Sequence, residues 1–115
     1  MKEKIAELKE KLRKLYEVVR VADRKARIAE LEKRSMEPDF WNDNRKAKVV
    51  LKEADTEKKW VAKHAAAEKA VHDAEDFLAM LAEGDDPEVR AELGRSVLQA
   101  EKEIEGLELM KMLGG

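Results

Sequence analysis

Apolar residues recur along most of this chain in steps of three and four, the spacing of an amphipathic or heptad-patterned α-helix. Near the amino terminus they form a narrow stripe, and Lys and Glu fill most of the positions between them. The stripe comprises Ile5, Leu8, Leu12, Leu15 and Val19. This pattern predicts a helix that packs along one seam.

The register of the stripe falters after residue 19. The next strong apolar pair is Ile28 and Leu31. We therefore predict a break near Ala22–Asp23, with Asp23 capping a second helix that runs to about residue 34 or 35. No Gly or Pro forces this break, so one continuous bent helix over residues 1–35 is the alternative.

Residues 36–43 form a corner that interrupts the helical pattern. Pro38 restricts the residue before it and predicts that the first helical arm ends at or before residue 36. Asp43 is a favourable N-cap for the following helix, and Asn42 offers the same chemistry one residue earlier. The adjacent rings of Phe40 and Trp41 are expected to pack against the helices that enter and leave the turn.

Beyond the corner, residues 44–83 contain no Gly or Pro and predict one long helix. Gly84 suits a left-handed C′ position, Asp86 an N-cap and Pro87 the first turn of a last helix over residues 87–113. The short link predicts that these two helices lie antiparallel. Their expected inner faces comprise Ala47, Val50, Ala54, Val61, His64, Ala67, Val71, Ala74, Leu78 and Leu81, followed by Leu93, Val97, Ala100, Ile104 and Leu107.

Composition agrees with this pattern. The chain has 115 residues, of which 43% are charged and only 4% aromatic, a profile typical of long helices. Its length suits one domain, residues 1–115. We expect an all-α, elongated antiparallel bundle of three to four helices with one very long central helix. Because the sequence has no apolar run of membrane-spanning length and no Cys, the cytoplasm is the expected location.

Charge is unevenly distributed along the chain. Residues 1–64 carry 19 Lys and Arg against 13 Asp and Glu, whereas residues 65–115 carry 5 against 13. Basic and acidic helices that lie side by side would neutralise each other, while an anionic surface such as RNA is the functional alternative. The basic residues that are candidates for such contact are Arg24, Lys25, Arg27, Arg45, Lys46 and Lys48.

The sequence offers little for catalysis. His64, Glu68 and His72 share one helical face, but no further ligand is evident, so we expect a packed His64, a surface His72 and no metal site. The sequence contains no phosphate-binding glycine loop, catalytic triad order or zinc-protease motif. We therefore expect no enzymatic activity, no cofactor, no membrane contact and no small-molecule substrate.

The corner and its surroundings resemble a known family. Residues 28–43, Ile-Ala-Glu-Leu-Glu-Lys-Arg-Ser-Met-Glu-Pro-Asp-Phe-Trp-Asn-Asp, and the Lys-Ala-Lys-Val that begins at residue 46 are similar to the amino-terminal domain of bacterial peptide chain release factor 2, a class I release factor. The acidic turn over residues 81–88 and the Leu-Glu-rich segment over residues 107–115 also resemble this domain. The most specific part of the resemblance comprises Pro38, Asp39, Phe40, Trp41, Asn42 and Asp43.

This resemblance implies a docking role in translation termination. In the family, the helical domain packs beside the other domains and reaches rRNA and protein at the stalk base of the large ribosomal subunit. The Gly-Gly-Gln loop that hydrolyses peptidyl-tRNA and the motif that reads stop codons lie in later domains, and neither is present here. The resemblance thus implies the first domain of such a factor, separated from its working parts. A standalone bundle that self-associates through the seam between Ile5 and Val19 is the alternative.

Overall fold

The computed structural model describes residues 1–114 and is helical over nearly all of that range. Its elements are α1 (Lys2–Val19), α2 (Val21–Ser35), the short 3-10 turn η1 (Phe40–Asn42), α3 (Asn44–Glu83) and α4 (Pro87–Gly114). The molecule measures 61 × 27 × 17 Å. The expected all-α, elongated bundle with a long central helix is confirmed.

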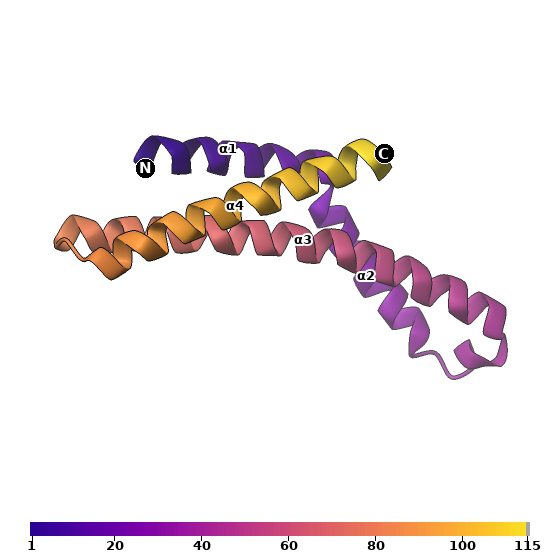
Figure 1. Ribbon diagram of the computed structural model, residues 1–115. Helices are drawn as coiled ribbons and strands as arrows, with labels where there is room; N and C mark the ends of the chain where they lie inside the picture. The colour runs from indigo at the N-terminus through magenta and orange to yellow at the C-terminus, as the bar shows by residue number, and fades with distance from the viewer. Residues whose placement is uncertain (115) are drawn as a thin grey trace.

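Helix α3 is the axis on which the other helices pack (Figure 1). Helix α4 returns along its carboxyl-terminal part, and α1 lies over both of them, whereas α2 packs along the amino-terminal part of α3. The main core therefore lies where α1, α3 and α4 meet. Its most deeply buried large side chains are Leu8, Val19, Val21, Ile104 and Leu107. Each such side chain contributes about 1.5–3 kcal/mol to stability by leaving water.

A second, smaller core joins α2 to the start of α3. It consists of Leu31, Val50 and Ala54, with the half-buried ring of Phe40 packed against it. This small core fixes the corner between α2 and α3. It also places that corner at the far end of the molecule from the turn that joins α3 to α4 (Figure 1).

The first arm is two helices, and the break lies at Arg20 rather than at Ala22–Asp23. Arg20 adopts a left-handed conformation with φ 63° and ψ 49°, and its N–H donates to the carbonyl of Glu17 at 3.1 Å. Asp23 is not the N-cap of α2, because it lies within the first turn and pairs with the Arg20 guanidinium at 2.8 Å.

The helix ends near the corner and the second turn follow the sequence signals with one exception. The Asp43 carboxylate accepts from the N–H groups of Arg45 and Lys46, and the Asp86 carboxylate caps α4 in the same way. Both predicted N-caps are confirmed. The prediction of a left-handed Gly84 is wrong, because its φ of 175° is that of extended backbone. This extended residue leads the chain directly into the Asp86 cap.

The amino-terminal seam is buried within the chain. All five of its apolar residues, from Ile5 to Val19, are 8% exposed or less and pack against α3 and α4. The alternative proposed this seam as the surface for self-association. That part of it is wrong, because α3 and α4 of the same chain already cover the seam. Ion pairs between described residues also join the basic and acidic parts of the chain, among them Lys4–Glu101, Lys9–Glu75 and Lys63–Glu103.

Candidate functional site

The corner between α2 and α3 presents the most unusual surface of the molecule. Its apolar side chains point into solvent, since Met36 is 81%, Trp41 59% and Val49 67% exposed. Trp41 meets Phe40 edge to face, with ring centroids 4.9 Å apart. Of the two rings that were expected to be buried, only Phe40 reaches the small core, because η1 turns Trp41 outward.

Cations surround these apolar side chains. Arg45, Lys46 and Lys48 on the first turns of α3 are all exposed, as is Arg34 near the end of α2. Arg34, Arg45 and Lys46, together with Val49, line a shallow groove of about 260 Å³. Within residues 1–114, none of these four cations makes an ion pair with a carboxylate. We call the surface formed by Arg34, Met36, Trp41, Arg45, Lys46, Lys48 and Val49 the corner surface.

The corner residues that resemble the family, from Pro38 to Asp43, have structural roles. Pro38 and Asp39 lie in the turn between Glu37 and η1, where the Phe40 N–H donates to the Glu37 carbonyl at 3.1 Å. The N–H of Asn42 closes η1 by donating to the carbonyl of Asp39 at 3.1 Å. This tight path ends at the Asp43 cap and sets the direction in which Trp41 points.

Two of the six basic candidates are occupied inside the chain. Arg24 is largely buried, where its Nε donates to the carbonyl of Val19 at 2.7 Å and its Nη1 lies 3.1 Å from a Glu57 oxygen. Arg27 forms a two-point pair with Glu53, with Nη2 to Oε1 at 3.0 Å. The Arg27 hydrogen bonds hold the pKa of the Glu53 carboxyl below its usual range.

The other four candidates face solvent in two separate places. Arg45, Lys46 and Lys48 lie together on the corner surface, whereas Lys25 is exposed on α2 and contributes to the electrostatic field around His64 on α3. The structure therefore separates a paired set, Arg24 and Arg27, from a free cluster at the corner.

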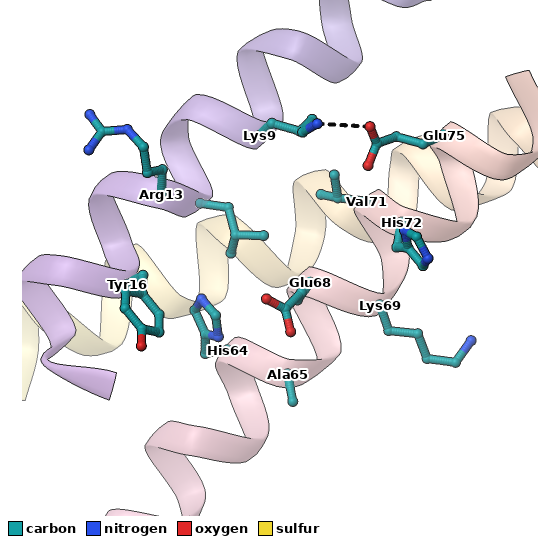
Figure 2. Close-up of a pocket in the computed structure, with 11 residues that line it drawn as sticks. Lys9, Arg13, Tyr16, His64, Ala65, Glu68, Lys69, Val71, His72 and Glu75 are labelled. Atoms are coloured by element: carbon teal, nitrogen blue, oxygen red, sulfur yellow. Dashed lines mark hydrogen bonds and ion pairs between the residues drawn. The ribbon is translucent and has the colours of Figure 1, made fainter. Parts of the chain in front are cut away.

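His64 lies between α1 and α3 and is only 4% exposed (Figure 2). Its ring centroid is 5.4 Å from that of Tyr16 on α1. Burial lowers the pKa of this imidazole, Lys25 lowers it further and Glu68 partly opposes the shift. His64 is thus packed as expected, and within residues 1–114 no three acidic, His or Cys side chains come close enough to hold a metal ion.

Acidification should weaken the fold through His64. Its folded pKa lies below the ordinary value, so the unfolded chain binds the proton more readily, and stability falls as pH decreases through about 6.5. We expect the free energy of unfolding, measured with urea, to fall between pH 7.5 and 5.5, with a slope of at most about 1.4 kcal/mol per pH unit for one proton. The loss should level off below the folded pKa.

Two variants identify the source of that pH dependence. His64→Leu should flatten the slope, whereas His72→Gln should keep it, because His72 is exposed on the surface and is not part of the buried core. An unchanged slope in the His64→Leu variant would contradict the assignment.

Trp60 was not among the residues expected on the inner face of α3. Its ring is 8% exposed and lies under the Arg24 guanidinium, 4.5 Å from the guanidinium carbon to the ring centroid. A signal was available, because position 60 precedes His64 by one helical turn on the same stripe, and a large ring there favours burial.

Within the described residues, no helix is both long and apolar enough to cross a bilayer.

Comparison with known proteins gives a family match. A profile described as "PCRF domain" matches residues 24–114. A protein named peptide chain release factor 2 from an Exiguobacterium species is 36% identical over 93 residues, which cover 81% of this chain and 25% of that protein. Proteins of the same name from Listeria innocua and a Nitratiruptor species are 34% and 32% identical, over 75% and 76% of this chain and 24% of each relative. The chain thus spans about a quarter of the length of these relatives.

Proposed function

This chain belongs to the PCRF domain family, and from that premise we propose that it is the amino-terminal docking domain of a peptide chain release factor. It acts in stop-codon-dependent translation termination in the cytoplasm and contacts rRNA and protein near the stalk base of the large ribosomal subunit. It performs no chemistry of its own, since stop-codon reading and peptidyl-tRNA hydrolysis belong to the remaining domains of the factor.

The observation that carries this proposal is the charge at the start of α3. A helix amino terminus carries a partial positive charge, so acidic residues are favoured in the first turn and basic ones are not. The first turn of α3 holds no acidic residue, and Arg45 and Lys46 stand there instead. Cations placed against the helix dipole cost stability locally, and such a conflict with local preference is expected at functional sites.

The surroundings of these cations fit a ribosomal partner. Phosphates meet exposed Lys and Arg, while Trp41 offers a half-exposed aromatic face and Met36 offers an apolar one. The corner surface stands at one end of a body 61 Å long, where nothing else in residues 1–114 covers it. We therefore assign docking to the corner surface, with Arg45, Lys46 and Lys48 as its phosphate-facing residues.

A binding titration tests this function directly. The fluorescently labelled chain is titrated with isolated large subunits and isolated small subunits between about 50 and 200 mM salt, the range in which phosphate contacts dominate the salt dependence. We expect measurable, salt-sensitive affinity for the large subunit and at least tenfold weaker affinity for the small subunit. Equal affinity for both subunits, or no competition with a complete release factor 2, would argue against docking at a specific site.

A further inference from the structure

A groove between α1 and α3 lies away from the corner surface and is not used by the proposed function. It has a volume of about 720 Å³, within the range of ordinary small-molecule sites. Figure 2 shows its walls: α1 contributes Lys9, Arg13 and Tyr16, and α3 contributes His64, Glu68 and Val71. Much of its lining is apolar, including the side chain of Leu12.

His64 is the polar group at the base of this groove. It is 4% exposed and makes no hydrogen bond to any side chain or backbone group of residues 1–114. No fully buried side-chain nitrogen or oxygen in that part of the chain lacks a hydrogen-bond partner, so the ring nitrogens of His64 reach the groove surface. A neutral imidazole has one acceptor nitrogen, and here that acceptor is unused.

The charges around the groove are balanced except at one residue. Lys9 pairs with Glu75 at 2.9 Å, Arg13 with Glu10 at 2.7 Å, and the third lining cation, Lys69, pairs with Asp73 at 2.8 Å. Glu68 has no ion pair or hydrogen bond within residues 1–114, and its carboxylate lies beside His64 in Figure 2.

We propose that this groove binds a small organic cation that carries a planar aromatic ring. The ring packs on Leu12 and Val71, and the cation lies between the Glu68 carboxylate and the 41% exposed ring of Tyr16. A protonated amine there donates to Glu68 and to His64, and the face of Tyr16 attracts the same positive charge. This binding site goes beyond the docking function, because it involves neither the corner surface nor the ribosome.

The test uses phenethylammonium as the probe and 3-phenylpropionate as its counterpart of similar size and opposite charge. Both are titrated into the full chain while NMR follows the resonances of Tyr16, His64 and Val71. We expect saturable shifts at these residues with phenethylammonium and a dissociation constant on the order of 1 mM, as for a fragment of this size. Binding of 3-phenylpropionate should be at least fivefold weaker, because Glu68 repels its carboxylate.

A matched pair of variants locates the charge. Glu68→Gln should weaken phenethylammonium binding about fivefold to tenfold, the loss expected for one charge-assisted hydrogen bond. Glu83→Gln removes the same charge at the exposed end of α3 and should change binding less than twofold. Equal binding of the two probes, equal effects of the two variants, or no saturable shift in the groove up to tens of millimolar would overturn the proposal. Because no ribosome is present, this result is independent of the docking experiment.

Discussion

Replacing Arg45, Lys46 and Lys48 together by glutamate is expected to weaken binding to the large ribosomal subunit roughly hundredfold near 0.1 M salt. Each lost phosphate contact also removes about 0.7–0.9 from the slope of log affinity against log salt. The slope should therefore fall by about 2–3 in the triple variant. Surface plasmon resonance on immobilised large subunits at several salt concentrations gives both quantities.

The same variant should fold at least as well as the parent chain. Glutamate at positions 45 and 46, in the first turn of α3, replaces an unfavourable interaction with the helix dipole by a favourable one, worth about 0.3–1 kcal/mol per residue at low ionic strength. Asp43 keeps its capping role, because that bond uses the backbone N–H groups of Arg45 and Lys46. Thermal unfolding followed by circular dichroism should show an unchanged or higher midpoint. Weaker binding joined to a more stable fold is a signature that general misfolding does not produce.

A control variant separates the corner surface from overall charge. Lys14→Glu, Lys59→Glu and Lys102→Glu, made together, give the same change in net charge at three exposed positions outside the corner surface. This variant should lose less than about fivefold in affinity, because charges farther than a Debye length of about 10 Å are screened near 0.1 M salt. If it weakened binding as much as the corner variant, the attraction would be diffuse and the corner would not be the docking surface.

The parts of the fold that follow from local chemistry were predictable from the sequence. The long helix begins and ends where expected because Asp43 caps it and the Gly84–Asp86 segment leads into the next cap. The apolar stripes were equally informative, since burial follows the periodicity of a helix. These signals act over a few residues, so the rest of the chain does not alter them.

The conformation at Arg20 could not be predicted, because it depends on contacts between distant residues. A left-handed residue is usually glycine, and Arg there is disfavoured by roughly 1–2 kcal/mol. The compensation comes from Arg24 and from the burial of Val19 and Val21 on either side of the break.

The sequence also did not show which cations would remain unpaired in the folded chain. From the sequence alone, Arg27 and Arg45 are both predicted to be exposed cations on helices. They differ only because the packing of α2 on α3 brings Arg27 to Glu53, whereas the corner turns Arg45 toward solvent. The pattern of residues along one helix does not show which residues of α2 lie opposite which residues of α3. That register depends on the small core around Leu31, which is assembled from α2, η1 and α3.

Arg24 therefore belongs to the architecture, and we expect Arg24→Ala to lower the free energy of unfolding by about 2–4 kcal/mol. The substitution removes the cation from the face of Trp60, the charged donor from the Val19 carbonyl at the helix break, and the partner of Glu57. Glu57 is 17% exposed, so its carboxylate would be left largely buried without compensation. Urea unfolding at pH 7 measures the loss.

Two comparisons make the Arg24 result specific. Arg13→Ala removes an exposed arginine whose partners Glu10 and Glu17 lie on the same helix, and it should cost less than about 1 kcal/mol. Adding Glu57→Gln to Arg24→Ala should restore part of the loss, because the amide needs no counter-charge. A destabilisation no larger than that of Arg13→Ala would show that Arg24 does not hold the break. Since Arg24 is occupied inside the fold, its variant should bind the large subunit normally at temperatures where it is folded, the reverse of the corner variant.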